Sequence, residues 1–480
     1  MIDIEKNGLT GCRRPGRRIL YRGYGMTALT RGKGARKNSS LPRLGLRDNV
    51  SGILAARRNQ LGFIQHAAAQ GDIVRMRLGG IPMVLINHPD YFQHVLVDDH
   101  ANYDKDNFLY RAVQTVFRGG LVSNPGGESW RVRRRMMQPS FNRGSIVDFT
   151  SGMTELTGDL LRRWADRSEP GAVVDVSGDI GDLALQIVLR SLFGVESTAD
   201  VKAFERNFLE LNTIVGNFFR MPFPPLDRRP RLRALIREMD DFVDRLIRDR
   251  RTETDERRDL FAALLNATHG HDGAGFTQQE LLGEILSTIV SGYETSSHSI
   301  AWVFYRLARH PEIQSRVQQE VDEVLQGQSP TFDSLTELPY TRMVIDETLR
   351  LHTPAWQTMR RALRDDEIGG YHIPRGSSVY LNFLTYHRHP EFWPDPERFD
   401  PERFTPENTA KRPRNVYQPF GSGPRHCIGK YFALTEIHII TAMLAQSFTV
   451  TVPAGQPPVG FSPLVTLHPR GGIHLHLTPR

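Results

Sequence analysis

Phe420-Gly421-Ser422-Gly423-Pro424-Arg425-His426-Cys427-Ile428-Gly429 decides the fold of this chain. It places Cys427 in a glycine-rich loop, directly before an apolar segment (about 429–446) that is typical of a helix. Glycine permits backbone geometry and close approach that other residues resist, and a helix N-terminus stabilises a thiolate. A lone cysteine is more often a small buried apolar residue, so its surroundings must distinguish that role from an axial ligand of haem iron.

The sequence shows no division into separate domains, although its length would allow two or three. The chain has 480 residues and two cysteines, Cys12 and Cys427, which exclude a disulfide framework. Beyond about residue 45 it has no Gly/Ser-rich linker, no internal repeat and no apolar run of the roughly 18 residues that suggest a membrane span. We expect residues 45–480 to form a single domain of a cytoplasmic protein without a membrane span.

The net charge of +7 comes from the N-terminal extension. Residues 1–44 hold 11 Lys and Arg against Asp3 and Glu5, so they carry +9 and the remainder of the chain −2. The basic balance is therefore no argument for nucleic-acid binding by the folded body. The extension is expected to be disordered. It is either a targeting arm or a dispensable segment, which translation from Met26 would largely remove.

Hydrophobic periodicity predicts a mainly α fold with a small β region. Apolar residues recur at helical spacing over most of residues 127–323. The expected helices cover 146–165, 180–193, 201–219, 232–249, 259–267 and 278–307. The last is apolar around much of its girth and is therefore expected to run through the core. Strands are expected at 73–78, 83–86, 367–373 and 378–382, with a C-terminal hairpin over 460–479 that turns at Gly471-Gly472.

The cysteine loop also carries a resemblance. Phe420, Gly423, Arg425, Cys427 and Gly429 match the pattern Phe-x-x-Gly-x-Arg-x-Cys-x-Gly, so the chain resembles the cytochrome P-450 family over essentially residues 45–480. The resemblance implies that family's α+β fold, in which a long central helix lies over the haem and the cysteine loop on its proximal side. It also implies haem b as cofactor, Cys427 as the axial iron ligand, and O2 as co-substrate.

Glu347 and Arg350 lie three residues apart in a predicted helix and can therefore pair on one face. Such pairs are commonly weak surface contacts. Here Arg403 follows in the stretch Phe399-Asp400-Pro401-Glu402-Arg403-Phe404, and the three residues resemble the family's buried structural triad.

Ser291-Gly292-Tyr293-Glu294-Thr295-Ser296 lies in the long predicted helix and resembles the family's oxygen-activation groove. Gly292 would leave room for dioxygen, Thr295 would hydrogen-bond it, and Glu294 would relay protons through water. The alternative is a set of hydroxyls that bond their own backbone.

Ser287, Ser291 and Thr295 are spaced by four residues and form a hydroxyl stripe on one helix face. We hypothesise that this stripe makes the pocket more polar than in fatty-acid hydroxylases and orients a substrate oxygen. The other expected pocket residues are Phe219, Trp356 and Val465.

Haem propionates need cationic donors, for which arginine is well suited. By resemblance, Trp130 and Arg134, four apart on one helix face, donate to a propionate. Arg425 and Arg360 match the family's other propionate-binding arginines, although the neighbouring Arg361 makes the assignment of Arg360 ambiguous. Phe420 completes the expected cofactor-binding set.

The chain has no dinucleotide fingerprint and no flavin or iron–sulfur motif. Electrons would come from NAD(P)H through a separate reductase with a ferredoxin or flavodoxin, or from peroxide. We hypothesise that the acidic carrier docks on a basic proximal face. Its expected residues are Arg131, Arg135, Lys411, Arg412, Arg414 and Lys430.

The resemblance implies a monomeric, bacterial-type haem-thiolate monooxygenase that inserts one oxygen atom of O2 into a C–H or C=C bond. Aromatic candidate pocket residues favour a bulky, mostly apolar terpene, polyketide or fatty acyl substrate of secondary metabolism. The alternatives on the same fold are a peroxygenase and a coupling or desaturating enzyme. Two other classes remain. One is a haem sensor or electron carrier, and the other is a different kind of enzyme that uses Cys427 as nucleophile with a nearby histidine such as His426 or His387. The acid–alcohol pair Glu294 and Thr295 argues against both.

Overall fold

The structure, a computed structural model, describes residues 41–42, 44, 59–78, 81–167, 172–196, 199–218, 229–252, 259–269 and 274–480. Two predictions fall outside the described residues. One concerns Phe219, and the other concerns the N-terminal extension (1–44), of which only residues 41, 42 and 44 are described. Within the described part of the chain, no helix has the length and apolarity needed to cross a bilayer.

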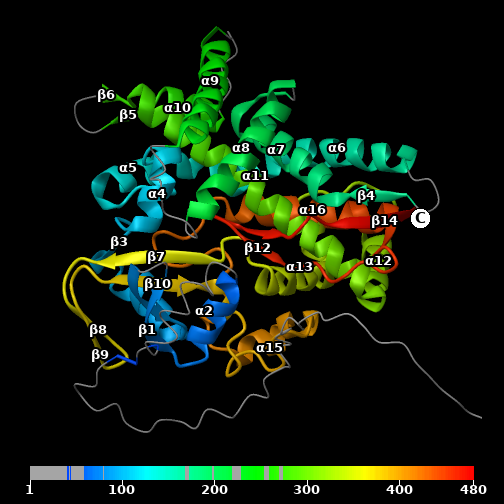
Figure 1. Ribbon diagram of the computed structural model, residues 1–480. Coiled ribbons are helices and arrows are strands. Elements are labelled where there is room, and N and C mark those ends of the chain that lie inside the picture. Colours follow the sequence, from blue (N-terminus) through cyan, green and yellow to red (C-terminus); the bar gives the residue numbers. More distant parts are fainter. Residues whose placement is uncertain are drawn as a thin grey trace, which may run out of the picture.

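Helices form most of the described chain; the main β-sheet lies at one side, and smaller sheets lie elsewhere (Figure 1). The helices are α2 Gln60–Ala68, α3 Pro89–Gln93, α4 Phe108–Phe117, α5 Gly127–Met137, α6 Arg143–Arg167, α7 Val176–Phe193, α8 Ala199–Phe218, α9 Pro230–Thr252, α10 Leu260–Leu265, α11 Gln278–Arg309, α12 Pro311–Leu325, α13 Pro339–Leu351, α14 Phe383–Tyr386, α15 Pro406–Lys411 and α16 Lys430–Ser447. All six predicted helices are present, with ends that differ by a few residues, and the mainly α class is confirmed.

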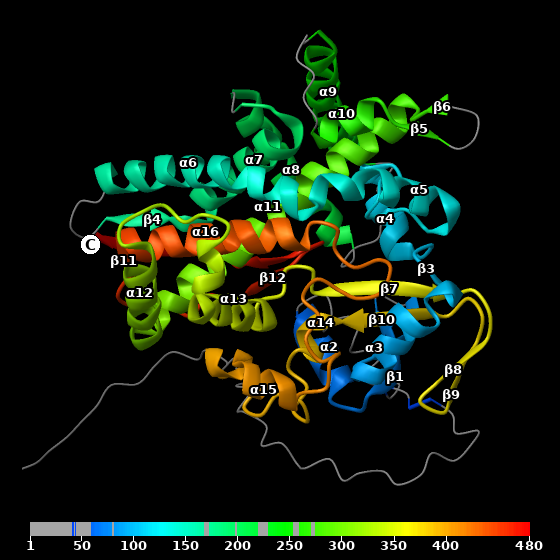
Figure 2. The same ribbon diagram turned by 180° about the vertical axis from the view of Figure 1, so that it is seen from behind.

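The central helix α11 is 32 residues long and runs through the helical part of the molecule (Figures 1 and 2). Its start is fixed by a capping box: the Thr277 N–H donates to the Glu280 carboxylate (3.0 Å), and the Glu280 N–H donates to the Thr277 hydroxyl (3.3 Å). The helix contacts α4, α7, α9, α13 and α16. Burial on most sides explains why its sequence is apolar around much of its girth.

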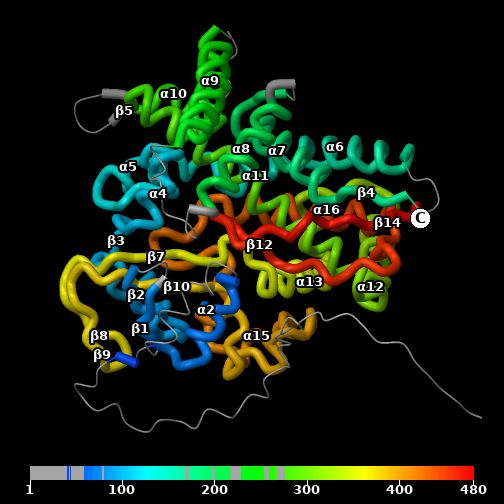
Figure 3. The backbone as a smooth tube through the Cα atoms, viewed as in Figure 1, coloured from blue at the N-terminus to red at the C-terminus, as the bar shows by residue number. Residues whose placement is uncertain are grey.

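The main sheet joins segments from both halves of the chain. Its strand order is β1-β2-β10-β7-β3, so N-terminal strands pair with strands that follow α13 (Figure 3). β2 and β10 are parallel and the other neighbours antiparallel. These strands are β1 Ile73–Leu78, β2 Ile81–Ile86, β3 Tyr103–Asp104, β7 Gln357–Ala362 and β10 Ser378–Asn382.

The smaller sheets correct two predictions. The strand expected at 367–373 is a hairpin of β8 (Asp366–Ile368) and β9 (Tyr371–Ile373), because Gly369 and Gly370 both have positive φ and form the turn. At the C-terminus, the hairpin pairs β12 (Phe461–Pro463) with β13 (Leu467–Pro469), so its turn precedes Gly471-Gly472.

The two glycines instead turn the chain into β14 (His474–Pro479), which pairs with β11 (Phe448–Thr451) and β4 (Val173–Asp175). The remaining pair is β5 Thr268–His269 with β6 Ala274–Gly275.

Candidate active site

The cysteine loop is held rigidly in front of α16. The Cys427 N–H donates to the Phe420 carbonyl (2.9 Å), and Gly421 and Gly423 have φ of 68° and 69°. A Cβ at Gly423 would lie 1.8 Å from the Leu96 carbonyl oxygen, so only glycine allows the loop to approach this segment. The helix then begins at Lys430 with Gly429 as its N-cap.

The Cys427 thiol faces an internal cavity. The accessible surface of Cys427 faces a cavity of about 390 Å³, and protein surrounds the residue on its other sides. Burial raises the pKa of the thiol above its ordinary value, and the Gly429 N–H, Arg134 and Lys430 offset only part of that rise. The helix N-terminus alone therefore does not produce a thiolate here; a coordinating metal ion would deprotonate the thiol.

Four cationic side chains line the same cavity, and Glu294 is the one acidic side chain among its described lining residues. Their hydrogen bonds go mainly to neutral acceptors: Lys105 to the Val122 carbonyl, Arg360 to the Thr358 hydroxyl and the Met359 carbonyl, Arg425 to the Asn124 and Pro125 carbonyls, and Arg134 to the His426 carbonyl and ring (2.7–3.1 Å).

Burial and the repulsion from Arg360 and Arg425 lower the pKa of Lys105 well below its ordinary value. Burial and repulsion from Arg360 likewise lower the pKa of Arg425 to about 10. Buried cations are ordinarily paired with anions. A ligand that brings two carboxylates would supply the missing negative charge. The cation cluster and the cavity-facing thiol therefore fit haem, whose propionates carry this charge.

The structure resolves the choice between Arg360 and Arg361. Arg361 pairs with Asp104 (2.6 Å) and Asp106 (2.8 Å) at the surface, whereas the Arg360 side chain is buried and lines the cavity. Trp130 also lines the cavity, where its ring lies 4.5 Å from the Arg425 guanidinium and supports it by a cation–π contact. Sequence reasoning missed Lys105, which has no motif and is recognised only by its burial beside other cations.

Glu347, Arg350 and Arg403 meet as a buried group. Arg350 binds the Glu347 carboxylate in bidentate fashion (2.6 and 2.8 Å), and Arg403 Nε lies 3.4 Å from Glu347 Oε1. Arg350 also donates to the carbonyls of His387, Pro396 and Arg398. The group thus joins α13 to the segment that leads to the cysteine loop.

On α11, Ser287, Ser291 and Thr295 all line the cavity, as their four-residue spacing requires. The Thr295 hydroxyl donates to the Ser291 carbonyl (2.8 Å), which is the backbone bond expected for threonine in a helix.

Gly292 has a packing role that the sequence did not reveal. A Cβ there would lie 2.9 Å from Val188 Cγ2, so the missing side chain lets α11 pack closely on α7. Gly292 also lines the cavity, so its expected role of leaving room for dioxygen stays a prediction.

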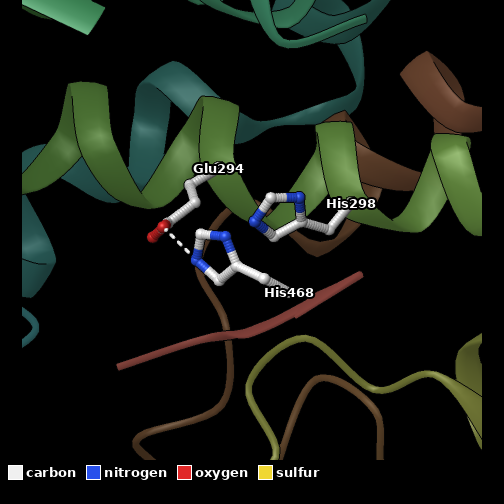
Figure 4. A group of neighbouring side chains, drawn as sticks. All are labelled: Glu294, His298 and His468. Atoms are coloured by element: carbon white, nitrogen blue, oxygen red, sulfur yellow. Dashed lines mark hydrogen bonds and ion pairs between the residues drawn. The ribbon is translucent and has the colours of Figure 1, made fainter. Parts of the chain in front are cut away.

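Glu294 has two partners that the sequence did not reveal. Its carboxylate accepts a hydrogen bond from the Asn212 amide of α8 and lies 3.0 Å from His468 Nε2 on β13 (Figure 4). Another histidine, His298, lies one turn further along α11, with its ring centroid 4.1 Å from that of His468. The i, i+4 spacing of Glu294 and His298 was a readable signal, but the β13 partner depends on tertiary structure.

Val465, an expected pocket residue, and Phe420, an expected cofactor-binding residue, also line the cavity. Trp356 does not: it is fully buried in the core beneath the main sheet, and its indole N–H donates to the Leu464 carbonyl (3.3 Å). The structure thus places Trp356 in the core and not in the cavity wall.

Neither histidine proposed as a base is oriented toward Cys427. The ring nitrogens of His387 contact the Thr353 hydroxyl (2.9 Å) and the Gln418 N–H (3.0 Å). Those of His426 contact the Gly423 carbonyl (2.9 Å) and Arg134 (3.1 Å). The nucleophile alternative has no support from this geometry.

Comparison with known proteins agrees with the site. The sequence profile of the cytochrome P-450 family matches residues 49–476. Cyclooctat-9-en-7-ol 5-monooxygenase of Streptomyces melanosporofaciens is 34% identical over 406 residues, which cover 82% of this chain and 85% of that protein. Pentalenene oxygenase of Streptomyces avermitilis is 32% identical over 433 residues, which cover 88% and 94% of the two chains. Cyclooctatin synthase of S. melanosporofaciens is 30% identical over 397 residues, covering 81% and 85%.

Proposed function

The chain belongs to the cytochrome P-450 family and is a monooxygenase, and we propose that its substrate is a bulky cyclic terpene that carries a hydroxyl group. One observation carries this proposal. Cys427 and the hydroxyl stripe of Ser287 and Ser291 border the same cavity, whose other walls are largely apolar. The related 5-monooxygenase is named for an alcohol and pentalenene oxygenase for a hydrocarbon.

When bound, haem with O2 and two electrons supplies the chemistry that inserts one oxygen atom into the substrate. In our proposal, the chain contributes four tasks. The Cys427 thiolate ligates the iron, and Lys105, Arg134, Arg360 and Arg425 neutralise the propionates. Glu294, the acidic group at the cavity, holds the proton to be delivered, and the Thr295 hydroxyl passes it on after leaving the Ser291 carbonyl. The apolar wall excludes bulk water.

The apolar walls of the cavity would bind the hydrocarbon skeleton. They include Val113 and Phe117 of α4 and Phe208, Leu211 and Val215 of α8. In this arrangement the Ser291 hydroxyl hydrogen-bonds the substrate oxygen and thereby selects which carbon faces the iron. Because a hydrogen-bonded pocket discriminates strongly against an analogue that lacks the polar group, the parent hydrocarbon should bind more weakly.

Two measurements test the proposal. The reduced carbonyl complex should give the Soret band of thiolate-ligated haem, and Cys427→Ser should lose it. Spectral titration with matched cyclic terpene alcohols and hydrocarbons should then show tighter binding of the alcohols. Ser291→Ala should remove this preference and alter the product's regiochemistry. The control is Ser297→Ala, on the same helix, where the hydroxyl bonds the Glu294 carbonyl and is outside the cavity lining. Equal alcohol selectivity in Ser291→Ala and the unmodified protein would contradict the proposed role.

We further propose that the protein is a cytoplasmic monomer that receives electrons from NAD(P)H through a reductase and an acidic ferredoxin or flavodoxin. The basic side chains that support docking differ in availability. Lys411, Arg414 and Arg135 are exposed, whereas Arg131 pairs with Glu128 (3.0 Å). Arg412 stacks over the rings of Trp393 and Phe404 (4.6 Å each). Lys411 and Arg414, both exposed in one short segment, are the pair that we assign to docking, whereas Arg412 supports the local fold.

A further inference from the structure

A compact group of metal-ligand side chains lies where α11 meets β13. Glu294, His298 and His468 each offer one ligand atom, and these three atoms lie within 4.8 Å of one another. Figure 4 shows the Glu294 carboxylate facing the His468 ring, with the His298 ring packed beside it. The carboxylate is nine-tenths or more buried, and the two imidazole centroids are 4.1 Å apart.

The hydrogen bonds within this group leave polar atoms unsatisfied. Asn212 Nδ2 contacts both Glu294 Oε1 and His468 Nε2, and the Thr466 hydroxyl also contacts His468 Nε2 (3.0 Å). Three groups thus compete for one ring nitrogen. By contrast, no described residue hydrogen-bonds His298 Nε2 or Asn212 Oδ1, although both atoms are buried. A buried polar atom without a partner calls for an unseen partner such as water or an ion.

We propose that Glu294, His298 and His468 form a binding site for a divalent cation of the zinc class. Two imidazoles and a carboxylate suit zinc, whereas calcium and magnesium prefer all-oxygen sites. Asn212 Oδ1 or a water supplies the fourth ligand. Zinc ligands lie about 2.0–2.2 Å from the metal, so the three side chains must move closer together on binding.

This site goes beyond the proposed monooxygenase function, because its existence is measured as bound metal. It also has a consequence for that function. A cation on the Glu294 carboxylate would occupy the one acidic side chain among the described residues of the cavity wall. Proton delivery would then stop, so zinc would act as a reversible inhibitor of turnover.

Equilibrium dialysis of the haem-loaded, tag-free protein against zinc chloride, with metal analysis, tests the site. The unmodified protein should bind one zinc per chain in addition to the haem iron, and excess magnesium should not displace it. His298→Ala and His298→Gln should each weaken this binding at least tenfold. His474→Ala, a partly exposed histidine on β14, is the matched control and should bind zinc like the unmodified protein.

Haem absorbance and thermal unfolding without zinc establish that each variant is folded, and only folded variants are compared. Zinc should also raise the thermal midpoint of the unmodified protein, and this shift should vanish in the His298 variants. Absence of zinc binding by the unmodified protein, or equal binding by the His298 variants, overturns the site and leaves the monooxygenase proposal intact. Zinc binding at this site without loss of turnover supports the site and removes Glu294 from proton delivery.

Discussion

Single residues in the cysteine loop are fixed by different physical constraints. Gly421 and Gly423 have nearly the same positive φ, yet their surroundings differ. A Cβ at Gly421 would meet nothing within 4 Å, whereas one at Gly423 would collide with the Leu96 backbone. The pair therefore separates the cost of a left-handed backbone from the cost of lost close packing.

We expect Gly423→Ala to lose far more thermal stability and haem content than Gly421→Ala. For either variant, a left-handed alanine costs about 1–2 kcal/mol. In Gly423→Ala the loop must also move away from Leu96 and displace Cys427. Haem absorbance per chain and the thermal midpoint measure both effects. Equal losses in the two variants would show that the close approach to Leu96 is unimportant.

Glu436 on α16 is a second residue with a testable consequence. Its side chain is fully buried. Burial raises the pKa of the carboxyl to about 8, and Ser296 offsets only part of this rise. From its ordinary pKa of 4.5 up to 8, the folded chain holds a proton that the unfolded chain has released. The free energy of unfolding therefore falls as pH rises through this window.

Glu436→Gln should remove this dependence, because the amide does not titrate. The slope of unfolding free energy against pH should change by up to roughly 1.4 kcal/mol per pH unit, and the variant should become relatively more stable at neutral than at acidic pH. Denaturant unfolding across the window measures the slope. The exposed Glu407→Gln is the control. An unchanged slope in Glu436→Gln would mean that its carboxyl is already ionised in the folded protein.

Helices were predictable as elements because long amphipathic periods leave little ambiguity, as the bounds of α6 (Arg143–Arg167) and α11 show. The strands were harder. A Gly-Gly pair indicates a turn, but not which strands flank it, and at Gly471-Gly472 the flanking strands pair with different partners. The close contact between α11 and α7 could not be predicted from the sequence either, because it depends on Gly292 lying against Val188.

Gly292→Ala should destabilise the contact between α11 and α7 by about 1–3 kcal/mol, the range for overpacking. Val188→Ala removes the colliding methyl groups, so the double variant should lose less stability than the sum of the single variants. Thermal and denaturant unfolding of all four proteins give the coupling energy. If Gly292→Ala instead retains stability and wastes electrons as peroxide, the glycine makes room for dioxygen as first expected.

At the scale of the whole molecule, charge is divided between surfaces. Lys411 and Arg414 lie at the end of α15 and beyond it, in the segment that runs to the cysteine loop (Figure 2). Arg248 and Arg251 are exposed on α9, which projects from the helical part (Figure 1). The two pairs carry the same charge on different parts of the molecule. Comparing variants of the two pairs therefore distinguishes an effect of local docking from an effect of net charge.

Reversing both charges of the docking pair, Lys411→Glu with Arg414→Glu, should slow reduction by an acidic ferredoxin at least several-fold, and the difference should shrink as salt screens the attraction. Arg248→Glu with Arg251→Glu alters net charge equally and should leave the rate nearly unchanged. Stopped-flow reduction under carbon monoxide measures each rate. Equal slowing by the two pairs would mean that the carrier responds to overall charge alone.

The sequence by itself determined the family, the helical class, Cys427 as candidate ligand and the α11 stripe, because each rests on local spacing. It also named Arg360 and Arg425, but without a reason to prefer Arg360 over Arg361. Only the tertiary structure distinguished Arg360 from Arg361. It also placed Lys105 in the cation cluster, Trp356 in the core and His468 beside Glu294. These depend on which distant segments meet, and burial and pairing between such segments leave no local pattern in the chain.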